Sequence, residues 1–248
     1  MDTIVSNRFA DHRVVVTGAS RDFGRTLAIR FAQEGAEVFL SARTLAGAQK
    51  VQDEIRALGH ASVHAFACDL TDPASIRDFA AKVTGVTDRI DILINNAARW
   101  LQGTDLLSAS DDDVVDTIAS GAIGTVLTTK NFLPLLLASD HPDIVTMVST
   151  CGVGGFDRSS AHDAFYAAKH AQAGFSDILS KRLRDKGVRV ISLYPPDFRN
   201  TDPLSDAWGS APRTPNDMLT SQSLSECVLF AVGQPRDCFI KSFHFEQV

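Results

Sequence analysis

The feature that most constrains the fold is the stretch 14–25, Val-Val-Val-Thr-Gly-Ala-Ser-Arg-Asp-Phe-Gly-Arg. Three β-branched residues predict a strand, and Gly18 predicts a tight turn directly behind it. Apolar residues then recur at helical spacing from Phe23 to Phe31, and Gly35 stops the pattern. A strand that turns into a helix N-terminus leaves backbone N–H groups unpaired, and the helix dipole adds partial positive charge. The pattern therefore indicates a pyrophosphate-binding turn, although an ordinary turn between a strand and a helix has the same signature.

Composition narrows the class of protein. With 248 residues, 44% hydrophobic and 22% charged, the chain is typical of one globular α/β domain over 1–248. A net charge of −6 without a basic block argues against a nucleic-acid partner. No apolar run has membrane-spanning length and no signal-peptide core is present, so we expect a cytoplasmic protein without a membrane partner. The scattered cysteines favour free thiols over a disulfide framework or a metal site; they are Cys68, Cys151, Cys227 and Cys238.

Strand and helix patterns alternate along the chain. Further strands are predicted at 37–41, 63–68, 91–95, 143–148, 188–194 and 239–243. Helices are predicted at 44–58, from 73 onward, and in a long region from 111 to 138 that Pro134 would bend. This alternation predicts a parallel sheet with helices on both faces. The segment of about 197–220, rich in Pro, Ser, Asp and Asn, fits neither pattern and is expected to be a substrate loop.

The end of the second predicted strand bears on the choice of cofactor. A dinucleotide fold that prefers NAD places an acid there, on the ribose 2′-hydroxyl, whereas this chain reads Leu-Ser-Ala-Arg and ends at Arg43. Arg43, together with Arg21 in the glycine turn, can pair with a 2′-phosphate. Either arginine alone would be read as a solvated surface charge. Both together predict NADP(H).

Tyr166 and Lys169 are three residues apart, which on a helix places them on one face. A nearby ammonium lowers the pKa of a phenol from its usual value near 10. Such a tyrosine can protonate a carbonyl oxygen as hydride arrives, or deprotonate an alcohol in reverse. Ser149 ends the fifth predicted strand and can donate to the same oxygen. The alternative is a tyrosine packed on the core beside a surface lysine.

These motifs resemble the short-chain dehydrogenase/reductase family over residues 10 to 245. The resemblance implies a doubly wound, seven-stranded Rossmann sheet, a nicotinamide cofactor, and a homotetramer or homodimer. It also implies that Tyr166 is the acid/base, that Lys169 lowers its pKa and binds ribose, and that Ser149 orients the substrate oxygen. The motifs that carry it are Thr17-Gly18 with Gly24, Asp69-Leu70, 95–98, Ser149, Tyr166 with Lys169, and Pro195.

The same resemblance assigns a cofactor site. Asp69 would contact the adenine, and Asn95 would line the site. The full expected set is Thr17, Gly18, Ser20, Arg21, Phe23, Gly24, Arg43, Asp69, Leu70, Asn95, Ala97, Tyr166, Lys169 and Pro195.

The chain departs from the family pattern at three positions. Asp22 replaces the middle glycine of the turn, where its carboxylate would cap the helix or repel phosphate. Pro196 replaces a glycine after the sixth strand and stiffens that loop. Gly121 stands where the family has an asparagine that holds a water for the proton relay. Our hypothesis is that a water held by backbone carbonyls beside Gly121, with Ser120, completes the relay; the alternative is that no relay exists.

The sequence thus predicts an NADP(H)-dependent oxidoreductase that interconverts a ketone and an alcohol on a small molecule. A glycine-rich insertion at 152–158 is expected to shape the substrate pocket. The expected lining is apolar and favours a bulky or aromatic substrate; it comprises Arg99, Trp100, Leu101, Phe156, Phe165 and the loop after Pro196. Two alternatives stay open: a cofactor-binding protein with little turnover, a sensor or pseudoenzyme, and an enzyme of epimerisation or dehydration.

Overall fold

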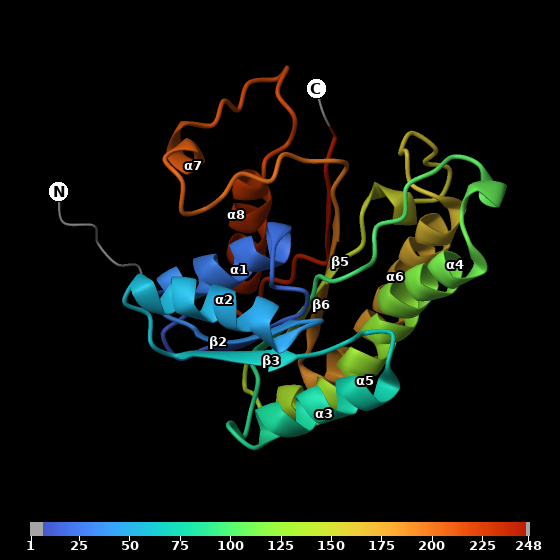
Figure 1. Ribbon diagram of the computed structural model, residues 1–248. Coiled ribbons are helices and arrows are strands. Elements are labelled where there is room, and N and C mark those ends of the chain that lie inside the picture. The colour runs from blue at the N-terminus through green and yellow to red at the C-terminus, as the bar shows by residue number, and fades with distance from the viewer. Residues whose placement is uncertain (1–6, 247–248) are drawn as a thin grey trace.

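The computed structural model describes residues 7–246. Within them one sheet of seven parallel strands has the order β3-β2-β1-β4-β5-β6-β7 (Figure 1). The predicted doubly wound parallel sheet is therefore confirmed. The strands are β1 Arg13–Val16, β2 Glu37–Ala42, β3 Val63–Ala67, β4 Ile92–Asn95, β5 Asp143–Met147, β6 Arg189–Tyr194 and β7 Ser242–His244.

Helices cover both faces of the sheet, as Figure 1 shows. The first face packs against α1 (Asp22–Gln33), α2 (Leu45–Ala57) and α8 (Ser221–Val232). The second packs against α3 (Pro73–Thr84), α5 (Gly124–Leu137) and α6 (Asp163–Arg182), and α4 (Asp111–Ile118) lies beside α6. The short helix α7 (Ala207–Ser210) lies in the predicted substrate loop. No helix within residues 7–246 is long and apolar enough to cross a membrane.

The alternation of side chains along each strand separates two apolar cores. In β1, Val14 and Val16 face the core under α1, α2 and α8, whereas Val15 faces the core under α3, α5 and α6. All three valines are fully buried. Burying both faces of a strand is why these segments read as continuous apolar runs in the sequence.

Local signals set several helix boundaries where they were predicted. The Thr44 side chain accepts a hydrogen bond from the Gly47 N–H (3.2 Å) at the start of α2. Asp72 accepts from the Ala74 N–H (2.8 Å), and Pro73 occupies the first turn of α3. Gly59, at φ +91°, follows the end of α2.

Two predicted elements differ from the structure. The last strand starts at Ser242 and not at 239, because pairing with β6 begins at the Ser192–Ser242 register; the apolar pair at 239–240 packs on the core without joining the ladder. The long helix is interrupted by a π-helical turn, Ala119–Ile123, which separates α4 from α5. Pro134 lies inside α5. The irregularity therefore falls at Gly121, where two helices approach closely.

Candidate active site

Strand order reverses between β1 and β4, so the crevice at the carboxyl ends of these strands is the place where open α/β sheets bind ligands. Gly18 follows β1, and Asn95 ends β4. Ser149 follows β5, and Pro195 follows β6. The predicted site residues from four separate motifs therefore meet at one edge of the sheet.

The glycine turn has no space for side chains at its two glycines. Gly18 has φ +66°, and a Cβ there would lie 2.6 Å from the Ala97 Cβ. A Cβ on Gly24 would lie 2.3 Å from the Gly18 carbonyl oxygen. Thr17 joins the turn to β4, because its Oγ1 accepts from the N–H groups of Asn96 (3.1 Å) and Ala97 (3.3 Å). The tight turn predicted at Gly18 is confirmed, and Gly24 packs closely against it.

Asn96, which sequence reasoning did not select, supports this turn. Its Nδ2 donates to the carbonyls of Thr17 (3.1 Å) and Gly18 (3.4 Å). The side chain of the predicted residue Asn95 instead donates to Thr129 Oγ1 on α5 (3.0 Å). Adjacent residues at the end of a strand point to opposite faces, and this alternation was the signal available to distinguish the two asparagines.

Asp22 does not cap α1. The helix begins at Asp22 itself, and Arg21 occupies the capping position without a side-chain hydrogen bond. Asp22 has φ +50°, whereas a capping residue needs an extended backbone to aim its side chain at the next N–H groups. Its carboxylate pairs with the Arg21 guanidinium, with 3.4 Å between Nε and Oδ2. The expected cap is therefore wrong, and the arginine beside it is partly neutralised.

The remaining predicted cofactor residues lie in segments that follow the carboxyl ends of β1, β2, β3 and β6. Arg43 is exposed directly after β2, and Ser20 lies in the glycine turn. Phe23 packs edge-on against Phe198 of the predicted substrate loop, with 5.4 Å between ring centres. Asp69 Oδ1 accepts from both the N–H (2.9 Å) and the hydroxyl (2.8 Å) of Thr71. Leu70 packs against Gly124, and the Pro195 carbonyl accepts from the Thr150 N–H (3.0 Å).

Ser149 adopts a strained backbone at the end of β5. Its φ of +85° lies in the region that favours glycine, and such strain costs about 1–3 kcal/mol and clusters at functional sites. Its N–H donates to the Leu193 carbonyl on β6 (3.1 Å), and its Oγ accepts from the Cys151 N–H (3.3 Å). These bonds hold the hydroxyl at the edge of the sheet.

Lys169 is buried on α6, and its hydrogen-bond partners do not include the Tyr166 hydroxyl. Its Nζ donates to the Met147 carbonyl (2.7 Å) and to Gln172 Oε1 (2.9 Å), and lies 5.2 Å from the centre of the Phe165 ring. Burial lowers the pKa of Lys169 to about 7. Residues four apart on a helix are offset by about 40°, and residues three apart by about 60°, so Phe165 faces the ammonium more directly than Tyr166 does.

Tyr166 points toward the loop after β5. Its hydroxyl accepts from the Ser159 N–H (3.2 Å). Burial raises the pKa of Tyr166, and the neighbouring Cys151 raises it further. Lys169 is not among the groups that shift the pKa of Tyr166 in this arrangement, so its effect on the phenol stays a prediction.

The space beside Gly121 is filled by protein. A Cβ on Gly121 would lie 2.9 Å from the Ala168 Cβ, and the Gly121 carbonyl accepts from Gln172 Nε2 (2.9 Å). Ser120 Oγ accepts from the Arg99 N–H (3.1 Å) and donates to the Thr117 carbonyl (3.3 Å). The predicted water bridge from Gly121 to Lys169 is replaced by the amide of Gln172, which the sequence analysis did not select although it lies one helical turn after Lys169.

Part of the predicted substrate lining comes together. Trp100 and Phe165 pack edge-on with 4.9 Å between ring centres, and Phe156 packs on the same small cluster. The Leu101 carbonyl accepts from the His162 N–H (2.9 Å), which joins this segment to the start of α6. Arg99 differs from expectation, because its guanidinium forms ion pairs on α4. Its partners are Asp113 and Asp116.

Comparison with known proteins identifies the family. The family model described as short chain dehydrogenase matches residues 12–208. The chain belongs to the short chain dehydrogenase family. It is 30% identical over 188 residues to 3-oxoacyl-[acyl-carrier-protein] reductase FabG of Escherichia coli (strain K12), covering 76% of this chain and 73% of that protein.

A second curated relative and a solved structure are similar to this chain over most of its length. It is 31% identical to 17-beta-hydroxysteroid dehydrogenase 13 of Mus musculus, over 79% of this chain and 64% of that protein. A metagenomic short-chain oxidoreductase, solved in complex with NADP, superposes with a TM-score of 0.79 at 25% identity, over 95% of this chain and 97% of that one. Membership of an oxidoreductase family is thus established together with the fold.

Proposed function

We propose that this chain binds NADP(H) and interconverts a ketone and an alcohol on a small, bulky or aromatic molecule. The observation that supports the proposal is that Gly18, Asn95, Ser149 and Pro195 lie at the carboxyl ends of four strands, at the edge of the sheet where strand order reverses. The relatives named reductase, dehydrogenase and oxidoreductase support the reaction class.

The residues present fit a dinucleotide. Gly18 and Gly24 leave a turn without side chains in front of the α1 N-terminus, where a pyrophosphate is stabilised by backbone N–H groups and the helix dipole. Asn96 and Thr17 hold that turn against β4. When bound, the nicotinamide supplies or accepts the hydride.

The charges favour NADP(H) over NAD(H). Arg43 is exposed at the end of β2, and no carboxylate occupies that strand end to bind a ribose 2′-hydroxyl. Arg21 is paired with Asp22, but both side chains are largely exposed, and an exposed ion pair contributes about 1 kcal/mol or less. A 2′-phosphate therefore competes for Arg21 at small cost.

Tyr166 and Ser149 are assigned to the reacting oxygen. A phenol with a raised pKa stays protonated at neutral pH, so Tyr166 acts as a proton donor in the reductive direction. Ser149, held by its strained backbone, donates its hydroxyl hydrogen to the same oxygen. Lys169 would hold the ribose with the ammonium hydrogen that neither the Met147 carbonyl nor Gln172 accepts.

A second candidate, a cofactor-binding protein with little turnover, is favoured by one observation. The Lys169 ammonium faces the ring of Phe165, which carries no proton to transfer, while the Tyr166 hydroxyl is engaged by the Ser159 N–H. A phenol without a nearby ammonium is a weak acid at neutral pH.

Two matched variants separate these candidates. NADPH oxidation over a panel of ketones and NADPH binding by fluorescence are measured for the wild type, Tyr166→Phe and Phe165→Tyr. If Tyr166 is the acid, Tyr166→Phe abolishes turnover but leaves NADPH binding intact. If the protein has little turnover because Phe165 faces Lys169, the wild type is nearly inactive and Phe165→Tyr raises the rate.

Retained turnover in Tyr166→Phe would refute the assignment of the proton donor. Conversion of substrate without net change in NADPH, detected by product analysis, would instead indicate the remaining alternative of epimerisation or dehydration.

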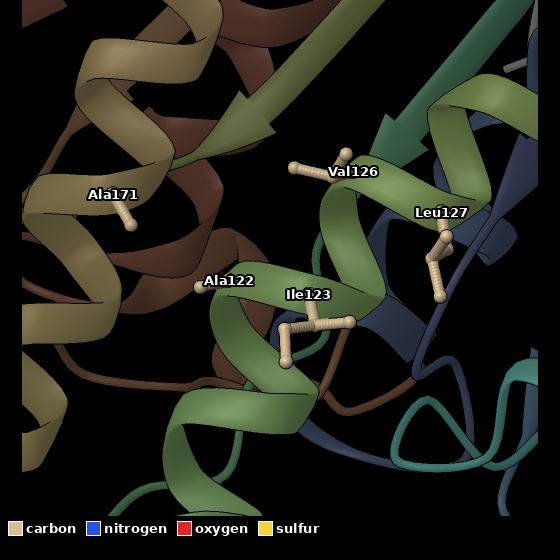
Figure 2. A pocket seen from close by; sticks show the side chains of 5 residues that line it. All are labelled: Ala122, Ile123, Val126, Leu127 and Ala171. Atoms are coloured by element: carbon tan, nitrogen blue, oxygen red, sulfur yellow. The ribbon is translucent and has the colours of Figure 1, made fainter.

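We also propose that the protein forms a homodimer or homotetramer through α5 and α6. Figure 2 shows an apolar hollow lined by side chains from both helices and the π-helical turn: Ala122, Ile123, Val126, Leu127 and Ala171. Ile123 and Val126 are exposed in the single chain, and association with a second copy would bury them.

Light scattering after gel filtration is expected to show an oligomer of the 26.8 kDa chain, and the substitution Ile123→Asp is expected to dissociate it. Leu107→Asp, at an exposed site elsewhere, is the control; a monomeric wild type would contradict the proposal.

A further inference from the structure

A buried glutamine connects the amine of the site to the irregular turn before α5. Gln172 lies on α6, is 1% exposed, and contacts both Lys169 and Gly121. We propose that Gln172 is a positioning residue, which holds the Lys169 ammonium at the carboxyl end of β5 by bridging it to the Gly121 carbonyl. The catalytic consequence rests on the function proposed above, whereas the structural role does not.

The side of Gln172 that faces Lys169 acts as an acceptor. Lys169 Nζ donates to Gln172 Oε1 (2.9 Å) and to the Met147 carbonyl at the end of β5 (2.7 Å). An ammonium has three donors and no acceptor, so two of its hydrogens are directed by these oxygens. The Phe165 ring, 5.2 Å away, borders a further side of the ammonium.

The other side of Gln172 acts as a donor. Nε2 donates to the Gly121 carbonyl (2.9 Å) and to Thr125 Oγ1 (2.8 Å), and the Thr125 hydroxyl donates to the same carbonyl (2.6 Å). The surroundings determine the orientation of the amide, because a reversed amide would direct its NH₂ group at the ammonium and its oxygen at a carbonyl. Each polar atom of the bridge thus has a complementary partner.

Gly121 makes the bridge possible. A Cβ at this position would lie 2.9 Å from the Ala168 Cβ, closer than two carbon atoms normally approach. Without that Cβ, α6 lies close enough to the π-helical turn for the Gln172 amide to reach a backbone carbonyl. The glycine and the glutamine therefore act as one unit.

The bridge matters most for the charged form of Lys169. Burial disfavours the ammonium, and the Cys151 thiol, on the loop after β5, is the titratable group that acts on it. Gln172 Oε1 and the Met147 carbonyl accept from the ammonium and so favour the charged form. Removing Oε1 leaves the burial unchanged and takes away one of the two acceptors.

The direct test follows the titration of Lys169 by NMR of ¹³C-labelled lysine side chains, with Lys169→Met used to assign the resonance. Gln172→Met keeps the length of the side chain and removes the acceptor; we expect the pKa of Lys169 to fall by about one to two pH units. Gln172→Glu keeps an acceptor and adds negative charge, so we expect the pKa to rise. Ser176→Ala, at a buried position one turn further along α6, is the matched control and leaves it unchanged.

The two variants give opposite signs, which a purely structural role for Gln172 would not produce. An unchanged Lys169 titration in both, with native circular dichroism, overturns the proposal. If Gln172→Met does not fold, Gln172→Glu decides alone: a raised pKa supports the bridge, and an unchanged or lowered one refutes it.

Kinetics separate this proposal from the proposed function. In an active wild type, the bridge predicts that Gln172→Met shifts the pH profile of kcat in the same direction as the Lys169 titration. If the wild type oxidises no NADPH with any ketone, the proposed function fails while the NMR result still tests the bridge. If the wild type is active and neither the titration nor the profile shifts in Gln172→Met, only the bridge fails.

Discussion

Adding one methyl group at Gly121 tests the contact that brings α6 to the π-helical turn. In Gly121→Ala the new Cβ would lie 2.9 Å from the Ala168 Cβ, whereas carbon atoms attract best at about 3.5–4.0 Å. One of the two segments must move by roughly 0.6–1 Å. Overpacking of this kind costs about 1–3 kcal/mol. Replacing a helical glycine with alanine also stabilises the helix by about 1 kcal/mol through its higher helix propensity, so the expected net destabilisation of the protein is about 0–2 kcal/mol.

A double-mutant cycle isolates the clash from helix propensity. Ala168→Gly removes the atom that the new methyl group meets, so Gly121→Ala in that background should gain stability. We expect a coupling free energy of about 1–3 kcal/mol from urea unfolding, and a change in Tm of about 2–4 °C per kcal/mol. Gly174→Ala, on α6 where a Cβ meets nothing within 4 Å, is the control and should stabilise the protein.

A coupling free energy near zero would refute the close packing at Gly121. The larger variant Gly121→Asn adds the same Cβ and an amide that competes with Gln172 for space. We therefore expect lower stability and no gain in turnover from this variant. A large rise in kcat with unchanged NADPH affinity would show that space exists for an asparagine, contrary to the structure.

Three further predictions concern single side chains of the site. Arg43→Ala should weaken NADPH binding by about ten- to a hundred-fold, which corresponds to the loss of one charge-assisted hydrogen bond, and should leave NADH binding unchanged. Equal losses in kcat/KM for both cofactors would contradict the assignment of Arg43 to the 2′-phosphate. Asp22→Gly should stabilise the fold by about 1 kcal/mol, because it relieves φ +50°, and should tighten NADPH binding by removing a carboxylate; weaker binding would show that the carboxylate helps. The buried Lys169 has a pKa of about 7, against about 10.4 in the unfolded chain. Between these two pH values the unfolded state binds more protons than the folded state. The free energy of unfolding therefore rises with pH, by up to about 1.4 kcal/mol per pH unit. Lys169→Met should remove that slope in urea unfolding between pH 7 and 10, and an unchanged slope would place its origin elsewhere.

The sequence predicted those parts of the molecule that local chemistry determines. The glycine turn requires a positive φ at Gly18 and close packing at Gly24, and only glycine satisfies both requirements there. Thr44 and Asp72 cap their helices through hydrogen bonds that span two or three residues. Such signals are contained in a few consecutive residues, so the pattern alone reveals them.

The interior of the site depended on contacts between distant segments. Asn95 ends β4 and Asn96 follows it. Alternation predicts that the two side chains face opposite ways, but their tertiary partners decide which one holds the glycine turn and which one binds α5. Tyr166 and Phe165 are likewise neighbours on α6, and the rule for helical spacing admits either as the partner of Lys169. The path of the chain between β5 and α6 directs the Tyr166 hydroxyl to the Ser159 N–H. The spacing of residues along α6 does not predict the path of that loop.

The departure from the family pattern at Gly121 is connected to Lys169 through α6. Gly121 removes a side chain from the π-helical turn, Ala168 fills the space left by its absence, and Gln172 uses the resulting proximity to bind the Gly121 carbonyl. The amine of Lys169 depends on the last of these contacts. An asparagine at position 121 alone would therefore clash with Ala168 and break the contact between Gln172 and the Gly121 carbonyl. We expect no proton relay to form in that variant. The residues around the amine form a coupled set, and a substitution at any one of them has to be interpreted together with the others.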